Sequence, residues 1–361
     1  FATLKAEIDA KLPATAQATL LTWTAPSRVV GPCAMGITSA LALGYDAKYC
    51  NSNAGGGCTL TASSPYFDSE SARPWTDHRM RPSMMLGAAT LDDAKALIAR
   101  GISADASRPA GEGWLMHTSD IDRSMRYDDQ RGLPARWAGD LALNFVDNSG
   151  GAGGAAGNSI SGKRDVLFYF TALAQTPGLS SNSYRPGAIG DSLTSYGGRL
   201  PDSLGHTPLS SWLAAGLTAS YGTVEEPCNF TAKFSRAGVL IDQYWRGARL
   251  IEAYWKSVER PGQGLFVGEP LAQPWPDAPS FAISGGQYVI DTRALRPNAS
   301  YTLEYRTSAT GNWINLATFN AARARQQSLR APLPPGTATQ LRWVGPCPTS
   351  NIEQCTLASS G

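Results

Sequence analysis

The sequence predicts an α/β fold with a mostly parallel sheet, followed by a small β-sandwich. Strand-like apolar runs alternate with amphipathic helices over most of the chain, which is the pattern of a parallel sheet flanked by helices. From Pro276 the pattern changes to short alternating strands separated by Gly, Pro and Asn turns. At 361 residues the chain also exceeds one typical domain. We therefore expect two domains, residues 1–275 and residues 276–361.

The composition argues against nucleic-acid binding and membrane spanning. The formal net charge is +2, so no strong positive field attracts nucleic acid or an anionic membrane. No apolar run approaches the roughly 20 residues of a membrane-spanning helix. Hydrophobic residues make up 42% of the chain, which is enough for a substantial core. Because the chain begins with Phe1 rather than Met, we expect it to be processed or incomplete at its start, with a leading strand missing.

The first half of the predicted sheet is built from short segments. The run ATLLTWT at 18–24 is a strand, and residues 37–43 form a short helix after a Gly-Pro-Cys turn. Residues 44–82 carry many aromatics and prolines without periodicity, which predicts a long irregular excursion. Thr90 is a suitable N-cap for a helix that ends before Gly101. Further expected elements are a helix at 2–12, strands at 83–86, 113–116 and 141–146, and a charged helix at 120–129.

The second half contains the strongest strand and the longest helix of the prediction. After a Gly/Ala/Ser loop at 149–163, the run DVLFYFT at 165–171 is a continuous apolar strand. Apolar residues at three- and four-residue steps predict one long helix over 239–258, ended by Pro261-Gly262. Further strands are expected at 187–196, 214–224 and 265–267. Ligands of open α/β sheets bind at the carboxyl ends of the strands, which is where we expect the site.

The cysteines indicate an exported protein. The chain has six: Cys33, Cys50, Cys58, Cys228, Cys347 and Cys355. Cys50/Cys58 and Cys347/Cys355 each bracket a polar loop, so we expect two local disulfides. Cys33 and Cys228 then either pair with each other or are free, and the sequence alone leaves other pairings open. Disulfides form in oxidising compartments, which predicts a secreted, periplasmic or extracellular location. No C-x-x-C motif occurs and the histidines are distant from every Cys, so no metal site is expected.

Several motifs give the chain a resemblance to known proteins. The segments PSRVVGPCAMGITSAL, SPYFDSESARP, GDSLTSYGG and AGLTASYGTVEEPCN resemble a family of exported bacterial proteins known only by sequence, over most of residues 18–274. The segment GLFVGEPLAQP resembles the closing element of gingipain-type cysteine peptidases, whose caspase-like fold is followed by an immunoglobulin-like domain. This resemblance implies a caspase/gingipain-like α/β domain. It also implies an immunoglobulin-like β-sandwich over 276–361, with a disulfide-stapled C-terminal tail.

The peptidase resemblance singles out one Cys and one His. Caspase-like peptidases place a catalytic His after one strand and a Cys after the next. In this chain the first place resembles 191–198, which holds no His, and the second resembles 220–223, several residues before Cys228. A Cys228–His206 dyad is the peptidase hypothesis, because a thiolate needs a nearby base. The carboxylates next to Cys228 disfavour a thiolate, and the alternative is a disulfide-bonded Cys228 with His206 as a loop residue.

Six polar residues form the predicted binding site. Asp191, Ser192, Thr194 and Ser195 stand where one strand ends, and Glu225 and Glu226 follow the next strand. Such side chains bind a ligand or a cation, or they hydrogen-bond locally in turns. Asp191, Ser192 and His206 also have the residue types of a hydrolase triad, but the G-x-S-x-G elbow is absent.

No complete catalytic set is visible in the sequence. We therefore expect an exported, non-catalytic protein of caspase-like architecture, without a cofactor. It would act at the cell surface or outside the cell, in binding a protein partner or in self-assembly, through its long loops and its β-domain. The alternative is a secreted cysteine endopeptidase that uses Cys228 and His206. A third hypothesis, a glycan-binding module, requires a row of exposed aromatic side chains.

Overall fold

The structure, a computed structural model, divides the chain into two compact units. It describes residues 1–22, 25–50, 58–276, 280–293, 295–296, 299–319, 327–336, 338, 340–345 and 355–360. The first unit, called the α/β unit here, contains residues 1–67, 73–244 and 249–274. The second, called the β unit, contains residues 68–72, 245–248 and 275–361.

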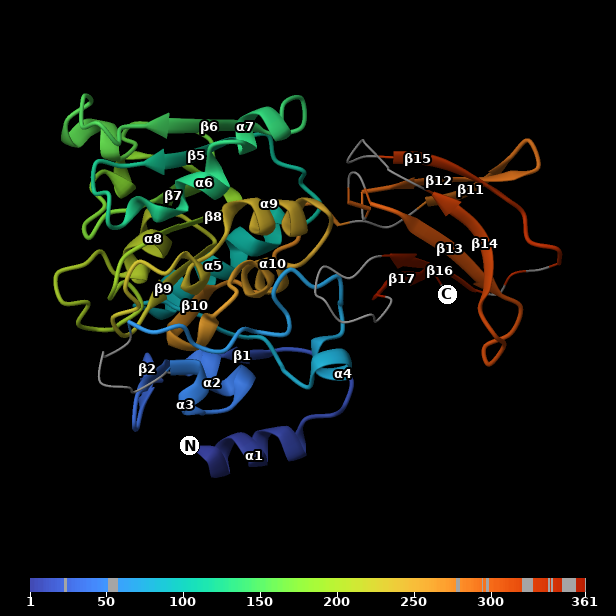
Figure 1. The fold of residues 1–361 in the computed structure, drawn as a ribbon, viewed down its shortest axis with the longest axis horizontal. Helices are drawn as coiled ribbons and strands as arrows, with labels where there is room; N and C mark the ends of the chain where they lie inside the picture. Colours follow the sequence, from blue (N-terminus) through green and yellow to red (C-terminus); the bar gives the residue numbers. More distant parts are fainter. Residues whose placement is uncertain are drawn as a thin grey trace. The chain divides into compact units, whose positions relative to one another are not determined.

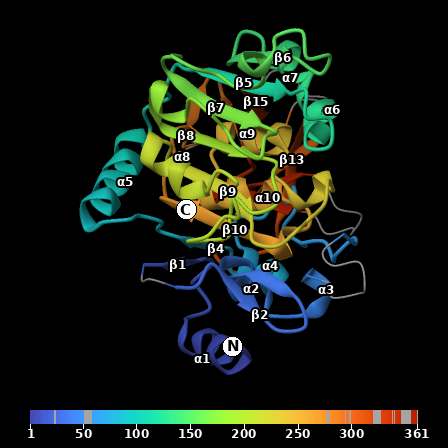
Figure 2. The same cartoon turned by 90° about the vertical axis from the view of Figure 1, so that its left-hand side faces the viewer.

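An eight-stranded sheet forms the centre of the α/β unit, in the order β1-β4-β10-β9-β8-β7-β5-β6 (Figure 1, Figure 2). Its strands are β1 Thr19–Leu21, β4 Ser83–Met85, β5 Glu112–His117, β6 Ala142–Asp147, β7 Val166–Thr171, β8 Tyr184–Ser192, β9 Ala219–Thr223 and β10 Gly264–Gly268. The block from β5 to β9 is parallel, whereas β10 is antiparallel to β9 and parallel to β4. The prediction of a mostly parallel sheet flanked by helices is confirmed.

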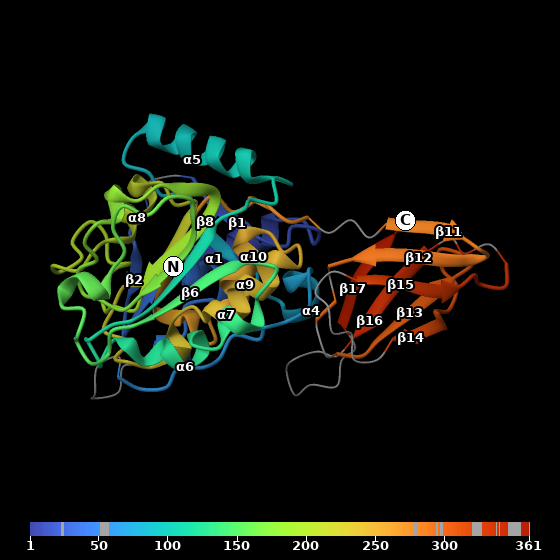
Figure 3. The same cartoon turned by 90° about the horizontal axis from the view of Figure 1, so that it is seen from above.

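Helices cover both faces of this sheet, and Figure 3 shows α5 and α6 on opposite sides. The helices are α1 Ala2–Lys11, α2 Ile37–Leu43, α3 Ala47–Cys50, α4 Pro74–His78, α5 Leu91–Ala104, α6 Tyr127–Gln130, α7 Leu133–Arg136, α8 Leu209–Ala215, α9 Ala237–Trp245 and α10 Leu250–Ser257. Short 3-10 turns lie at Ser124–Arg126, Ala155–Asn158, Leu179–Ser181, Thr231–Lys233 and Pro261–Gln263. A hairpin of β2 Arg28–Val30 and β3 Ala34–Gly36 precedes α2.

The strand β10 shows how alternating side chains join the sheet to both helix layers. Leu265 and Val267 belong to an apolar cluster that also contains residues of α2, α5 and α8. Phe266 points to the opposite face and stacks on the Trp255 ring of α10, with the ring centroids 4.4 Å apart. The strand β7 lies inside the sheet and all its residues are buried, which explains its continuous apolar sequence.

The helix α5 begins where it was predicted to begin but ends later. Thr90 Oγ1 accepts a hydrogen bond from the Asp93 N–H, and the Asp93 carboxylate accepts one from the Thr90 N–H, both at 3.1 Å. This reciprocal capping box fixes the first turn. The helix continues to Ala104, so the predicted end before Gly101 is wrong. Gly101 is instead a packing position, because a Cβ there would overlap the Glu269 carboxylate.

Two glycines interrupt segments that were predicted to be continuous. The predicted helix over 239–258 is two helices, because Gly247 between α9 and α10 has a φ of +105°. That left-handed value is incompatible with an unbroken α-helix. The predicted strand over 214–224 begins with the end of α8, which Gly216 terminates with a φ of +119°.

The β unit contains two small antiparallel sheets, in the orders β11-β12-β15 and β14-β13-β16-β17. Its strands are β11 Ser280–Ser284, β12 Gln287–Thr292, β13 Tyr301–Arg306, β14 Ile314–Phe319, β15 Gln327–Pro332, β16 Gln340–Gly345 and β17 Cys355–Ser360. Apolar residues from both sheets, among them Ile290 and Leu303, form its core. The segment 68–72 joins this unit through Glu70, whose carboxylate lies 2.8 Å from Arg246 Nη1 and 2.6 Å from Arg296 Nε.

Candidate functional site

The carboxyl ends of β8 and β9 lie next to each other at one edge of the sheet, because the two strands pair in parallel. Glycine permits the close approach, since a Cβ on Gly222 would overlap the backbone of Gly198. The Gly198 N–H donates to the Thr223 carbonyl at 2.9 Å. Thr223 Oγ1 in turn donates to the carbonyls of Thr194 and Ser195, at 2.9 and 2.8 Å. The loop after β8 is therefore fixed to the end of β9.

Asp191 at the end of β8 is fully buried and belongs to the core rather than to a binding surface. Its Oδ1 accepts from Arg126 Nη1 at 2.6 Å, and its Oδ2 accepts from the hydroxyls of Ser235 and Tyr254. Arg126 Nη2 also donates to the Thr171 carbonyl at 2.8 Å. Both oxygens of Asp191 and both terminal nitrogens of Arg126 thus have partners, as a buried ion pair requires.

Ser192 is buried as well, and its hydroxyl is hydrogen-bonded to the backbone of Leu173. Its Oγ donates to the Leu173 carbonyl at 2.8 Å and accepts from the Leu173 N–H at 3.0 Å. Asp191 is paired with Arg126, and among the described residues neither Asp191 nor Ser192 is hydrogen-bonded to His206. The Asp191/Ser192/His206 triad is therefore not formed. Ser192 is hydrogen-bonded to the backbone of Leu173, and Asp191 is hydrogen-bonded to buried side chains.

His206 contacts the loop that follows β8. Its Nδ1 and Thr194 Oγ1 form a short hydrogen bond, and the Tyr196 ring lies edge-on to the imidazole with centroids 5.3 Å apart. Burial lowers the pKa of His206, and the Arg123 guanidinium lowers it further, whereas the Glu226 carboxylate acts in the opposite direction. The imidazole is therefore neutral at pH 7, and it lies within electrostatic reach of two opposite charges.

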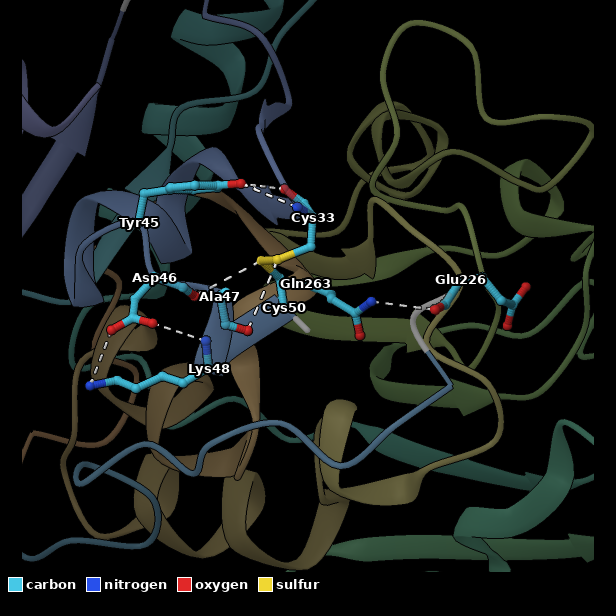
Figure 4. Close-up of a disulfide and its surroundings, with 8 residues drawn as sticks. All are labelled: Cys33, Tyr45, Asp46, Ala47, Lys48, Cys50, Glu226 and Gln263. Atoms are coloured by element: carbon cyan, nitrogen blue, oxygen red, sulfur yellow. Dashed lines mark hydrogen bonds and ion pairs between the residues drawn. A yellow bond between two sulfur atoms is a disulfide. The ribbon is translucent and has the colours of Figure 1, made fainter. Parts of the chain in front are cut away.

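Glu225 and Glu226 follow β9 and differ in their surroundings. Glu225 Oε2 lies 2.9 Å from Arg28 Nη1 in a half-exposed ion pair. Glu226 Oε1 accepts from the Cys228 N–H at 2.8 Å, and its carbonyl accepts from Gln263 Nε2 at 3.3 Å (Figure 4). The loop after β9 is thus attached to the start of β10 through Gln263.

The disulfides join other partners than those expected. Cys33 pairs with Cys50 (Figure 4), and Cys58 pairs with Cys228. The expected Cys50–Cys58 pair is therefore wrong, and so is the Cys33–Cys228 alternative. The helix α3 brings Cys50 back to Cys33, where the Tyr45 hydroxyl donates to the Cys33 carbonyl at 2.6 Å. The Cys58–Cys228 bond depends on tertiary contacts, since its cysteines are 170 residues apart.

The remaining predicted disulfide lies outside the described part of the chain. Cys347 is not among the described residues, and only the backbone of Cys355 is described. The Cys347–Cys355 pair stays a prediction. No cysteine among the described ones is a free thiol, which is typical of a protein that folds in an oxidising compartment.

A pocket of about 290 Å³, called the edge pocket here, lies at the carboxyl ends of β8 and β9. Six of its lining residues follow these strands: Leu193, Thr194, Ser195, Glu226, Cys228 and Asn229. Three come from elsewhere: Asp122, Arg123 and Phe234. The structure thus brings Thr194, Ser195 and Glu226 of the predicted set together with Cys228. Glu225 and the buried Asp191 and Ser192 are not among the lining residues.

A buried lysine lies beside the edge pocket. Lys233 precedes the pocket residue Phe234, and its Nζ lies 5.2 Å from the centroid of the Phe230 ring. Burial lowers the pKa of Lys233 to about 8, Arg260 contributes in the same direction, and Glu226 opposes them. At neutral pH this ammonium adds a positive charge near Glu226.

A second pocket of about 650 Å³ has His206 among its lining residues. Its lining consists of two loops, 175–180 and 205–208, and three residues of α8, Ser211, Ala214 and Ala215. The hydrogen bond between Thr194 and His206 joins the linings of the two pockets. The second pocket carries no acidic or basic side chain apart from His206, so it offers less basis for ligand specificity.

Asp122, Arg123 and Phe234 line the pocket but are not among the residues predicted from the sequence. Asp122 and Arg123 lie after β5, in the segment predicted as a charged helix, and Phe234 lies just before α9. The available signal was that β5 is parallel to the central strands, so its carboxyl-end loop reaches the same edge. Predicting which residues of that loop face β8 and β9 requires the tertiary fold.

Among the described residues, no group of three His, Cys, Asp or Glu side chains is arranged to hold a metal ion. No helix in the part of the chain that the structure describes is long and apolar enough to cross a membrane. None of the protein families, curated proteins or solved structures compared with the chain matches it.

Proposed function

We propose that this protein is an exported, non-catalytic binding protein of caspase-like architecture, related to the exported bacterial family that its motifs resemble. Its β unit is an immunoglobulin-like domain in this proposal. The protein acts at the cell surface or outside the cell, where the edge pocket binds a ligand and the β unit supports contact with a protein partner or with other copies.

The observation that carries this proposal is the state of Cys228. A cysteine peptidase needs a thiolate, and a sulfur that is bonded to Cys58 provides none. The His206 imidazole, which would serve as the base, is hydrogen-bonded to the Thr194 hydroxyl instead. Around Cys228 the edge pocket presents two carboxylates, a guanidinium, hydroxyls and apolar side chains, which is the mixture of groups found in small-ligand sites.

The secreted cysteine endopeptidase remains the second candidate, and one observation favours it. Cys228 lines the same pocket as Thr194, the hydrogen-bond partner of His206, so both residues of the hypothetical dyad lie at the same edge of the sheet. Reduction of the Cys58–Cys228 bond would be required to generate the nucleophile.

Peptide mapping under non-reducing conditions separates the two candidates. The exported chain is treated with iodoacetamide in its folded state, denatured, digested and analysed by mass spectrometry. We expect a linked Cys58–Cys228 peptide, no alkylated Cys228, and no casein hydrolysis before or after mild reduction. Rapid alkylation of Cys228, with hydrolysis that Cys228→Ser and His206→Ala both abolish, would replace the binding proposal with the peptidase.

A further inference from the structure

Two opposite charges line the edge pocket without pairing with each other. Glu226 Oε1 accepts from the Cys228 N–H at 2.8 Å, and Arg123 Nη1 donates to Asp120 Oδ2 at 2.7 Å. Among the described residues, no hydrogen bond or ion pair engages Glu226 Oε2 or the Nε and Nη2 of Arg123. Each group therefore keeps part of its hydrogen-bonding capacity for a ligand, and the two groups demand opposite charges from it.

The charges of Arg123 and Glu226 both act on the imidazole of His206. Arg123 and Glu226 act on the imidazole in opposite directions, so both lie within electrostatic reach of the same ring. Asp122 adds a second carboxylate to the pocket lining. The lining therefore offers a guanidinium to an anionic group and carboxylates to a cationic group.

The remaining walls are apolar or weakly polar. Leu193 is 2% exposed and Phe234 is fully buried, so neither presents accessible surface to a ligand side chain. Thr194, whose hydroxyl is hydrogen-bonded to His206, and Ser195 line the same pocket. The volume of about 290 Å³ is at the lower end for ligand pockets, which selects a small molecule.

We infer that the edge pocket binds a small zwitterion, a free amino acid or a dipeptide. The ligand's carboxylate is bound by Arg123 and its ammonium group by Glu226. This inference rests on the proposed binding function and adds the chemical class of the ligand. A guanidinium and a carboxylate that do not neutralise each other are the complement of such a molecule.

Isothermal titration calorimetry with the oxidised full chain tests the inference directly. The probes are leucine, leucyl-leucine, N-acetyl-leucine and leucinamide. We expect leucine or leucyl-leucine to bind, and comparison of these two distinguishes a free amino acid from a dipeptide. N-acetyl-leucine lacks the ammonium charge and leucinamide lacks the carboxylate, so each should bind at least about tenfold more weakly than leucine.

Two variants assign the charges to residues. Glu226→Gln keeps an acceptor for the Cys228 N–H, and it should weaken leucine binding about tenfold while leaving the weak N-acetyl-leucine binding unchanged. Arg123→Gln should weaken leucine binding about tenfold while leaving leucinamide binding unchanged. The matched controls are Glu225→Gln, next in sequence but paired with Arg28, and Arg131→Gln, exposed and paired with Asp128. Both controls should bind leucine like the wild type.

Three results would overturn the inference. They are equal affinity for leucine and its blocked derivatives, unchanged leucine affinity in Glu226→Gln and Arg123→Gln, or no heat from any of the four probes. A thiol count on the same sample separates these failures from failure of the proposed function. If Cys228 is not free and leucine does not bind, only the zwitterion inference is refuted. If Cys228 is free and alkylated and casein is hydrolysed, the binding proposal itself is refuted.

Discussion

The carboxyl ends of β8 and β9 are neighbours, yet their polar side chains differ in how many partners they have. Asp191 at the end of β8 is fully buried, and both its oxygens accept hydrogen bonds from Arg126, Ser235 and Tyr254. Glu226 after β9 is half-exposed, lines a pocket, and engages only one carboxylate oxygen among the described residues. The sequence predicts ligand binding by both residues for the same reason, which is that each stands where a strand ends.

This difference shows that position at a strand end is not sufficient for a binding role. A buried carboxylate whose oxygens are all engaged stabilises the fold, and exposing it to a ligand would break a core ion pair. A carboxylate with an unengaged oxygen at a pocket wall costs the fold little and remains available. The comparison therefore predicts large stability effects at the β8 end and small ones at the β9 end.

Asp191→Ala should give the largest effect. Removing the carboxylate leaves the Arg126 guanidinium buried without its counterion, so we expect the free energy of unfolding to fall by about 3–5 kcal/mol. Urea unfolding followed by tryptophan fluorescence measures it. Asp128→Ala, which removes an exposed carboxylate paired with Arg131, is the control and should cost less than about 1 kcal/mol. Equal losses in both variants would contradict the structural role of Asp191.

The disulfide at the β9 end should give the next largest effect. In the double variant Cys58→Ser/Cys228→Ser we expect a loss of about 2–4 kcal/mol, because the unfolded chain regains the entropy of a long loop. Cys33→Ser/Cys50→Ser opens a shorter loop, with a separation of 17 rather than 170 residues, and should cost less. Urea unfolding of both double variants under identical conditions makes the comparison, and the reverse order of stability would show that loop length does not control it.

Glu226→Gln should barely change stability. Glutamine retains the acceptor for the Cys228 N–H, and the side chain is only half-buried, so we expect a change within about 0.5 kcal/mol. The same urea experiment applies. A loss above about 1 kcal/mol would place Glu226 with Asp191 as a structural carboxylate and remove the distinction between the two strand ends.

The smallest expected effect is a change in pH dependence at His206. Burial lowers its folded-state pKa below the unfolded value of about 6.5, so the unfolded state binds more protons at mildly acidic pH. The free energy of unfolding should therefore decrease as the pH falls from 7 through this range. His206→Gln should remove that part of the decrease, which urea unfolding at several pH values between 7.5 and 5 measures. Parallel pH profiles of the two proteins would contradict the assigned cause.

Local patterns in the sequence were enough to predict elements whose shape depends on near neighbours. The continuous apolar run of β7, and Thr90 at the start of α5, are satisfied within a few residues or by burial on both faces of the sheet. The order β6-β5-β7-β8-β9 then follows from pairing in the assembled sheet, which the alternation of strands and helices predicts only as a mostly parallel sheet.

Features that depend on distant partners were not predictable. Arg126, which neutralises Asp191, is 65 residues away, and Cys58 is 170 residues from Cys228. The break between α9 and α10 is a further example, because Gly247 lies within an apolar periodicity that continues on both sides of it. A periodicity reports which face is buried, not whether one helix or two provide that face.

The long Cys58–Cys228 separation also determines how the chain matures. If the chain is exported during synthesis, as the proposed function allows, Cys33, Cys50 and Cys58 arrive close together, and the 170 residues up to Cys228 follow over roughly 10–30 s at ordinary synthesis rates. Throughout that interval the nearest thiols compete for one another, and a Cys50–Cys58 bond is the shortest ring they can close. Such a bond must be exchanged before the native pairs form, through attack by a thiolate on the incorrect disulfide. For such an exported chain we expect the yield of folded protein to depend on disulfide isomerisation, and expression in a compartment without an isomerase should give mixed cross-linked species.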